Sequence, residues 1–456
     1  MILHKTELST PTPTPTPATS VEPGEEWKLN TGTINLGSSI TYIGTGISVS
    51  GTTVNITAGG DHIVKGTLSN GMIIIDTTER VKLRLSGANI TNTNGPAIYC
   101  KNADKFFITL EENTINTLTD TSTYTDQTAK GTLFSNDDLE IRGKGTLNIT
   151  GKFNHAISGD DDVTIENGVI IVISAVNDGI HANGSLNIKG GTLNITVSKD
   201  ALQSETEEIL IEDGALTLSA GSQGLTTDTG VTINGGNIKV IKCNEGIQSK
   251  LTNINGGTLS IESTDDSLNS SMGKRTEAND GSQLSINGGS VYLSATKGDT
   301  IDINGNAKFT GGTVIVCGST GEPGADVNGT FTISGGLVLI TGSNNGMNEY
   351  PTGASPQYTI ATMLTAAQTA NTALCVKDST GKVLAITKPK RNFYSIVFSS
   401  SELKQGSAYT LYIGGTVLGG TEINDLIAGA SYTGGTAVST ITVTTSPTTA
   451  INWRTR

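Results

Sequence analysis

Residues 187–195 read Asn-Ile-Lys-Gly-Gly-Thr-Leu-Asn-Ile, and residues 253–261 read Asn-Ile-Asn-Gly-Gly-Thr-Leu-Ser-Ile. This unit, two apolar alternations joined by a turn pair that ends in glycine, recurs between residues 130 and 346. The successive turn glycines are 23, 23, 22, 21, 32, 23 and 24 residues apart, so one unit takes about 23 residues and one carries an insertion of about ten. A fixed period of this size predicts a repeat architecture. The turn glycines are Gly168, Gly191, Gly214, Gly236, Gly257, Gly289, Gly312 and Gly336.

Each unit holds two or three short runs of period two, rich in Ile, Val, Leu and Thr and separated by Gly, Asn and Asp. Such runs predict strands and turns, and no 3.6-residue period lies between them. A leucine-rich repeat would contain helical filler, and a propeller blade would need roughly 40 residues. The pattern therefore predicts an all-β fold, a parallel β-helix in which each strand pairs with its equivalent about 4.8 Å away in the next coil.

Inward positions of the coils should form aliphatic ladders along the solenoid. The 57 glycines, the 4% of aromatic residues and the 35% of hydrophobic residues fit many tight turns around a core of small and β-branched side chains. A solenoid can be extended by further coils without forming a second hydrophobic core, so a single solenoid accounts for most of the 456 residues. The expected inward residues are Ile188, Leu193, Ile195, Ile211, Leu216, Leu218, Ile233, Ile238 and Val240.

The chain divides into four predicted parts. Residues 1–26 contain a strict Pro-Thr alternation and should form a disordered, semi-rigid linker. Residues 27–350 form the β-helix, with an irregular capping end before the strict repeats. Residues 351–415 form a β-rich cap over the open end, in which residues 361–370 are a short helix or strand. Residues 416–456 are a Gly/Thr-rich tail without an assigned structure.

Composition narrows the class of protein. The formal net charge of −13 argues against nucleic acid as a partner. No run of 18 apolar residues is present, so we expect no transmembrane helix. No apolar signal-peptide segment precedes the linker, so we expect a processed chain. Pro/Thr tracts tether extracellular modules, so we expect a monomer that is secreted or attached to the cell surface through this linker. Cys243 and Cys317 should lie inside as small apolar residues.

A column of acids accompanies the repeats. When the coils are aligned on an inward Ile or Leu, the residue two positions earlier is acidic in five of six consecutive coils. Stacking converts such positions into files of oxygen atoms about 5 Å apart. The six residues are Asp178, Asp200, Gln223, Glu245, Asp266 and Asp299, and the column three positions later holds His181, Gln203, Thr226, Gln248, Asn269 and Asp302.

Parallel carboxylates at this separation repel by roughly 0.8 kcal/mol per pair in water, and by more in a partly buried cleft. Asn or Thr would avoid that cost, so the retained acids indicate a bound cation. The ligands are oxygen atoms without clustered Cys or His, which favours Ca²⁺ over Mg²⁺. The alternative is a solvated acidic edge that discourages association. His155 and His181 are interpreted as hydrogen-bonded turn residues.

Several runs resemble the bacterial extracellular carbohydrate-binding β-helix family, which is related in fold to the pectate lyases. They are residues 66–71, 83–90, 94–99, 116–120 and 131–139, together with the repeated Asp-Gly-Ile-His and Glu-Gly-Ile units. The resemblance covers roughly residues 30–415. It implies a right-handed parallel β-helix with bound calcium that recognises plant cell-wall polysaccharide, including polygalacturonate-like chains and cellulose.

The resemblance also implies which residues carry calcium. Asp178, Asp200, Glu245, Asp266 and Asp299 match the calcium-bearing column, with Asp265 and Asp302 as neighbours. Gln223 interrupts the column and divides it into separate ion sites.

Three functions remain open: a calcium-dependent polysaccharide-binding module, a polysaccharide lyase and a structural spacer. A lyase needs a base within hydrogen-bond reach of the proton beside a uronate carboxylate. Lys199, next to Asp200, is the first candidate for this base, and Lys250 and Lys297 are weaker candidates. The adjacent carboxylate would raise the pKa of Lys199 unless an ion neutralises it, and a second basic column is missing, so we expect binding without catalysis.

Overall fold

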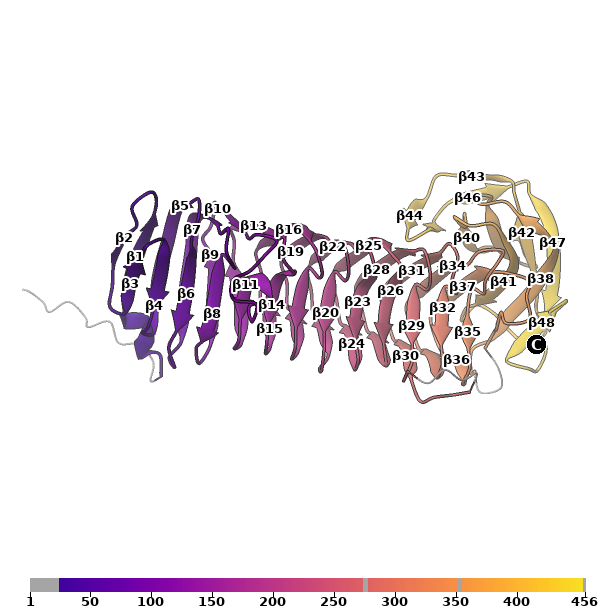
Figure 1. Cartoon of the computed structure of the whole chain (residues 1–456). Helices are drawn as coiled ribbons and strands as arrows, with labels where there is room; N and C mark the ends of the chain where they lie inside the picture. The colour runs from indigo at the N-terminus through magenta and orange to yellow at the C-terminus, as the bar shows by residue number, and fades with distance from the viewer. Residues whose placement is uncertain (1–23, 274–277, 352–354, 454–456) are drawn as a thin grey trace, which may run out of the picture.

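The computed structural model describes residues 24–273, 278–351 and 355–453, so most of the predicted Pro/Thr linker lies outside the described residues. The fold is a parallel β-solenoid of about 12 turns with about 23 residues per coil, as predicted. Figure 1 shows the coils stacked along one axis, with a separate β unit at the C-terminal end. No helix among the described residues is long and apolar enough to cross a membrane.

Each regular coil contributes one strand to each of three faces. Face 1 carries the strand that follows the predicted acid column, and its strands pair in parallel from coil to coil. Its regular strands are β8 (Ile98–Asn102), β11 (Gly131–Ser135), β14 (His155–Gly159), β17 (Ile180–Ala182), β20 (Leu202–Ser204), β23 (Gln223–Thr227), β26 (Glu245–Ser249), β29 (Leu268–Ser270), β32 (Ile301–Ile303) and β35 (Asp326–Val327).

Face 2 follows after a turn and ends at the repeated Gly-containing turn pair. Its strands are β9 (Phe106–Leu110), β12 (Leu139–Gly143), β15 (Val163–Ile165), β18 (Leu186–Ile188), β21 (Ile209–Ile211), β24 (Gly230–Ile233), β27 (Leu251–Ile254), β30 (Gln283–Ile286), β33 (Asn306–Phe309) and β36 (Phe331–Ile333).

Face 3 begins after that turn pair and leads into the acid column of the next coil. Its strands are β10 (Ile115–Thr119), β13 (Thr146–Gly151), β16 (Val169–Ala175), β19 (Thr192–Thr196), β22 (Ala215–Ser219), β25 (Asn237–Cys243), β28 (Thr258–Ser263), β31 (Ser290–Ala295), β34 (Thr313–Cys317) and β37 (Leu337–Gly342).

The aliphatic ladders lie inside, as the period predicts. Leu193 pairs with Leu216, Leu216 with Ile238 and Ile238 with Leu259, and all four are buried. All nine expected inward residues are buried. The eight turn glycines have φ between 76° and 123°, a left-handed conformation that glycine adopts without steric cost.

The N-terminal end is less regular than the coils. Two antiparallel pairs, β1 with β2 and β3 with β4, precede the long parallel strands β5 and β7. Its elements are η1 (Glu26–Leu29), β1 (Thr31–Leu36), β2 (Thr41–Ile43), β3 (Ile47–Ser50), β4 (Thr53–Ile56), β5 (Gly60–Leu68), β6 (Met72–Asp76) and β7 (Val81–Thr91).

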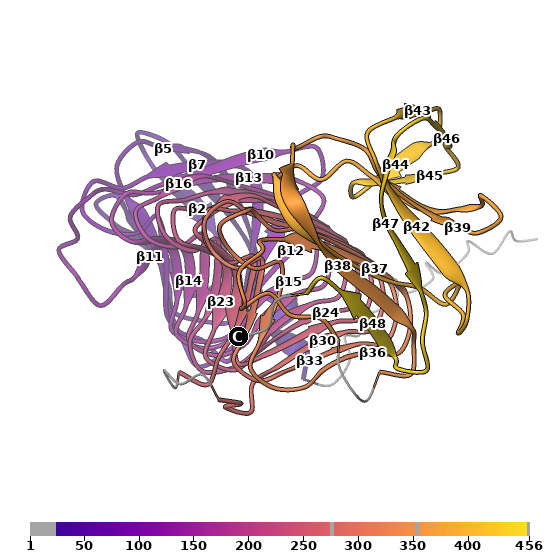
Figure 2. The same cartoon turned by 90° about the vertical axis from the view of Figure 1, so that its right-hand side faces the viewer.

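The C-terminal unit packs against the last coils, and Figure 2 shows it beside the stacked coils. Its strand β41 pairs antiparallel with β37, so it extends face 3 past the last coil. Residues 361–370, predicted as a helix or strand, lie almost wholly in strand β38. Strands β44, β45 and β47, from beyond residue 415, join one sheet with β39, β40 and β42. The strands of the unit are β38 (Thr359–Gln368), β39 (Leu374–Asp378), β40 (Val383–Thr387), β41 (Phe393–Ser399), β42 (Ala408–Ile413), β43 (Thr416–Leu418), β44 (Thr421–Ile423), β45 (Leu426–Ala428), β46 (Ser431–Thr433), β47 (Thr436–Thr442) and β48 (Thr448–Ile451).

Candidate functional site

The structure stacks the predicted acid column on face 1. The inward residues used for the alignment pair in register from coil to coil, so the residues two positions before them also stack. The column three positions after the acids follows the same pairing, and Asp302 of this column pairs with Asp326. The inward series is Ile180, Leu202, Leu225, Ile247, Leu268 and Ile301.

Several carboxylates of the column bind the backbone of the next coil. Asp178 Oδ1 accepts a hydrogen bond of 3.1 Å from the backbone N–H of Asp200. Asp200 Oδ1 accepts one of 2.8 Å from the N–H of Gln223. Each carboxylate thus accepts a hydrogen bond from a backbone N–H in the turn that would otherwise need another partner. This role, which the sequence pattern did not predict, explains an acid at these two positions without an ion.

The acids gather most closely near Gly298, at the C-terminal end of the column. A Cβ atom added at Gly298 would collide with the Oδ1 atoms of both Asp265 and Asp266. Glycine therefore leaves a small space that is bounded by two carboxylates from one coil. Asp299 and Asp302 come from the next coil. The negative charge of Asp302 acts on both Asp266 and Asp299, and the charge of Asp266 acts on Asp299.

Two carboxylates of this group, those of Asp266 and Asp299, resist ionisation. Burial and the charges of Asp302, Asp265 and Glu245 raise the pKa of Asp266 to about 8. Burial and the charges of Asp266 and Asp302 likewise raise the pKa of Asp299 to about 8. A bound cation would offset this repulsion.

Glu245 lies one coil before this group. Its Oε2 atom is buried and has no hydrogen-bond partner among the described residues. Burial, followed by the charge of Asp265, raises the pKa of Glu245. An unsatisfied buried carboxylate oxygen is costly, so a ligand at this position would relieve the cost.

The other end of the column has different chemistry. Asp178 Oδ2 lies 2.9 Å from Nδ1 of His155 and 3.2 Å from Nδ1 of His181. Burial disfavours the charged form of Asp178, but hydrogen bonds from the two histidines outweigh burial and lower its pKa. The sequence analysis interpreted His155 and His181 as hydrogen-bonded turn residues. Both have hydrogen-bond partners, but they lie in strands β14 and β17, and their rings stack beside one carboxylate, a cluster that the sequence did not indicate.

A polar groove follows face 1 at the end of its strands. It consists of two adjoining hollows of about 400 and 360 Å³ that share Thr226, Thr227 and Asp228. The first hollow reaches back to Gln203, and the second reaches forward to Gln248. The remaining lining residues are Ser204, Glu205, Thr206, Ser249, Lys250, Ser271, Met272 and Gly273.

Residues 271–273 belong to the insertion of about ten residues that breaks the 23-residue period. The insertion follows β29 and supplies one wall of the groove. Sequence reasoning located the insertion but could not assign this role, because the wall depends on where residues 271–273 lie relative to the neighbouring coils.

Lys199, the base candidate, has an exposed side chain in the turn before Asp200. Lys250 lines the groove. Lys297 precedes Gly298 in the turn of the acid group.

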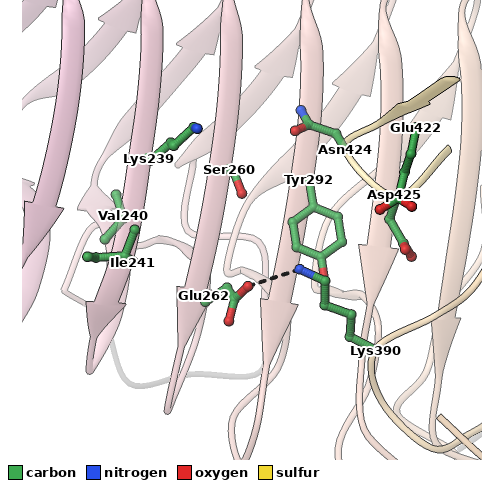
Figure 3. A pocket seen from close by; sticks show the side chains of 10 residues that line it. All are labelled: Lys239, Val240, Ile241, Ser260, Glu262, Tyr292, Lys390, Glu422, Asn424 and Asp425. Carbon is green, nitrogen blue, oxygen red and sulfur yellow. Dashed lines mark hydrogen bonds and ion pairs between the residues drawn. The ribbon is translucent and has the colours of Figure 1, made fainter. Parts of the chain in front are cut away.

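A second cleft lies on face 3, below the overhanging C-terminal unit (Figure 3). It has a volume of about 410 Å³, and an ion pair of 3.1 Å between Lys390 and Glu262 spans it. Asn424 reaches from the hairpin of β44 and β45 and donates hydrogen bonds to the backbone oxygens of Leu259 and Ser290. This cleft is therefore the junction between the solenoid and the C-terminal unit, on a different face from the acid column.

A family profile described as carbohydrate-binding domain-containing protein matches residues 50–324. A protein of Acetivibrio thermocellus with the same description is 37% identical over 134 residues, which are 28% of this chain and 47% of that protein. The matched region thus spans about half the length of that relative.

A solved structure is also similar, the gadolinium derivative of a polysaccharide lyase-like protein from C. thermocellum. The match has 27% sequence identity and a TM-score of 0.41, and it covers 61% of this chain and 96% of that chain. The C-terminal unit lies beyond the residues that the family profile matches.

Proposed function

Because this chain belongs to the carbohydrate-binding domain-containing protein family, we propose that it binds plant cell-wall polysaccharide, polygalacturonate and cellulose, outside the cell. Calcium held by the acids of face 1 bridges the protein and the uronate carboxylates. The observation that carries this proposal is the group of acids around Gly298, where an added Cβ would collide with Oδ1 of both Asp265 and Asp266. Burial, together with the charges of neighbouring acids, raises the pKa of Asp266 and of Asp299 to about 8.

The donors around Gly298 are carboxylate oxygens, the ligand type that calcium prefers. Calcium takes six to eight oxygen ligands in a flexible geometry. Asp265, Asp266, Asp299 and Asp302 would hold the ion, and the buried Oε2 of Glu245 lies one coil before them. Asp178 and Asp200 stay predicted ligands, and each, like Asp266, already accepts a backbone N–H of the next coil.

The groove supplies the surface for the sugar chain. Gln203, Thr226 and Gln248 stack in register along it, and Asn269 and Asp302 continue the same column. Amide and hydroxyl groups both donate and accept hydrogen bonds, as sugar hydroxyls do. A polymer laid along this column would pass from the groove to the acid group, where a bound ion would meet its carboxylates.

Calorimetric titration tests the proposal. Polygalacturonate and a neutral glucan are titrated into the full chain with calcium chloride or with chelator, at matched ionic strength because salt screens charge contacts. We expect at least a tenfold weaker affinity for polygalacturonate in chelator and in Asp266→Asn, with a much smaller change for the glucan. Glu212→Gln, an equal charge change at an exposed turn residue, is the matched control.

Equal binding of polygalacturonate with calcium and with chelator would exclude the calcium bridge. Failure to bind either polymer would exclude the groove as the polysaccharide site.

The alternative function is calcium-assisted β-elimination, with Lys199 as base. The proposed binder should give no steady rise in ultraviolet absorbance with polygalacturonate and calcium at alkaline pH. A rise that disappears in Lys199→Ala would favour the lyase instead.

The proposal that the chain is exported rests on the Pro/Thr tract of the sequence and on the extracellular location of the proposed ligand. Cell fractionation of the producing organism tests it, and protein confined to the cytoplasm would contradict it.

A further inference from the structure

Two imidazoles and one carboxylate from neighbouring coils meet at the N-terminal end of the acid column. His155 starts β14, Asp178 lies in the turn before β17, and His181 lies within β17. Their exposed fractions are 5%, 2% and 4%. One ligand atom from each lies within 4.8 Å of the other two. The group therefore combines nitrogen and oxygen donors in a site closed to bulk water.

The distances between these donors match those around a small divalent ion. Asp178 Oδ2 lies 2.9 Å from His155 Nδ1 and 3.2 Å from His181 Nδ1. Gln203 Oε1, from the next coil, lies 3.2 Å from the same nitrogen of His181. Zinc bonds of about 2.0–2.2 Å place neighbouring ligands roughly 3 Å apart. Three donors from two coils thus lie close together, and Gln203 of a third coil contacts one of them.

Hydrogen bonds around the group hold the donors in the orientation that an ion needs. His181 Nε2 lies 3.1 Å from Asn183 Oδ1 and 3.4 Å from Glu205 Oε1. The Asn183 amide is itself oriented, because its Nδ2 donates to Asp160 Oδ1 at 3.1 Å. Nε2 thus faces two oxygen acceptors, and Nδ1 faces Asp178 and Gln203, so a metal at Nδ1 would displace the proton that Nδ1 shares with Asp178. Such outer partners are typical of histidines that bind metals.

The carboxylate is oriented as well. Asp178 Oδ1 accepts the backbone N–H of Asp200, so Oδ2 is left to face both imidazoles. The two rings stack with centroids 4.2 Å apart and 25° between their planes. Both Nδ1 atoms contact the same oxygen, so they lie on the same side of the stack. Binding of one ion by both nitrogens would require one ring to turn out of the stack, because an imidazole binds a metal in its ring plane.

From this geometry we propose that His155, Asp178, His181 and Gln203 form a site for a divalent transition-metal ion, with zinc as the principal occupant. Two imidazole nitrogens favour zinc over calcium, which prefers oxygen ligands alone. Four protein ligands close a tetrahedral site, so the ion is structural. It joins three successive coils at the end of the groove, where Gln203 also lines the wall.

This inference does not rest on the calcium bridge, because the acids around Gly298 lie at the other end of the column. It assigns Asp178, an acid of the predicted calcium column, to zinc instead. Zinc chloride is titrated into calcium-free full chain, purified without a histidine tag, and chelator competition gives affinity and stoichiometry. Cobalt substitution gives visible bands characteristic of its coordination. We expect one tightly bound zinc per chain and a higher melting temperature with zinc.

His155→Phe preserves a stacked ring but removes a ligand, so zinc affinity should fall at least tenfold while circular dichroism stays unchanged. Gln203→Ala removes the amide ligand at a part-buried position and should also weaken zinc binding. Asp266→Asn, the matched control in the oxygen-only group, should leave zinc binding unchanged. Absence of tight zinc binding in the parent chain, or equal affinity in the parent and both folded ligand variants, would overturn the proposal.

Discussion

The backbone N–H of Asp299 donates a hydrogen bond of 2.8 Å to Oδ1 of Asp266, the equivalent acid one coil earlier. This contact holds two partly buried acids next to each other, where their charges would repel. The same bond that stabilises the turn therefore creates a position where a cation would be favoured.

The raised pKa values predict an unusual dependence of stability on pH. Below about 8 the folded chain keeps protons on Asp266 and Asp299, whereas the unfolded chain releases them near the ordinary value of 3.8. The folded chain binds more protons in this window, so this contribution to stability is present at low pH and is lost as pH rises through 8.

In chelator, the melting temperature of the parent should therefore fall between pH 6 and pH 9, and saturating calcium should reduce the fall. The double variant Asp266→Asn, Asp299→Asn serves as the control for all other titrating groups, and it should show a smaller fall. Identical pH profiles of parent and double variant in chelator would contradict the prediction.

Two substitutions at Asp200 distinguish its structural role, as acceptor of a backbone hydrogen bond, from the effect of its charge. Asp200→Ala should lower the free energy of unfolding by about 1–3 kcal/mol, because the N–H of Gln223 loses its acceptor. Asp200→Asn retains an oxygen and should recover most of that loss. Chemical denaturation measures both.

If Asp200 also contributes to polysaccharide binding through its charge, Asp200→Asn should weaken retention on polygalacturonate without a matching loss of stability. Equal stability of the Ala and Asn variants would show that loss of the hydrogen bond to Gln223 does not cause the lower stability of Asp200→Ala.

The turn glycines should tolerate no side chain where coils stack tightly. Gly257 has a φ of 76°, and an added Cβ would lie 2.6 Å from the carbonyl oxygen of Gly236 in the coil below. Gly257→Ala should lower the free energy of unfolding by about 1–3 kcal/mol or more from left-handed strain plus this clash.

Gly87 provides the matched control. It has the same φ, but an added Cβ would meet no atom within 4 Å. Gly87→Ala should therefore cost less, and thermal melting compares the two. A larger effect at Gly87 would show that close stacking is not the cause.

Asn424 should anchor the C-terminal unit to the solenoid. Its side-chain amide donates to the backbone oxygens of Leu259 and Ser290 at 3.3 and 2.9 Å. Asn424→Gly keeps the left-handed φ of 47° but removes these bonds. We expect faster hydrogen exchange in β44 and β45 and a lower melting temperature.

Asn371→Gly is the control, since Asn371 is exposed and has a φ of 62°. If both variants exchange alike in β44 and β45, the amide contacts do not hold the unit in place.

Sequence alone determined the repeating part of this protein. Gly-containing turn pairs at an almost constant spacing and period-two apolar runs set both strand direction and coil length, because one residue of slip would turn every inward side chain outward. The stacking of Asp178, Asp200, Glu245, Asp266 and Asp299 followed from that register before any coordinates.

Only the tertiary structure decided what the stacked positions do. Acids that are equivalent in the repeat differ in their partners: Asp178 contacts two imidazoles, Asp200 binds a backbone N–H, and Asp266 also shares a small space with Asp265 beside Gly298. The groove wall at residues 271–273 and the docking of Asn424 depend on segments outside the repeat. A period predicts which residues are neighbours, but side-chain rotamers, burial and packing of non-repeated segments set their chemistry.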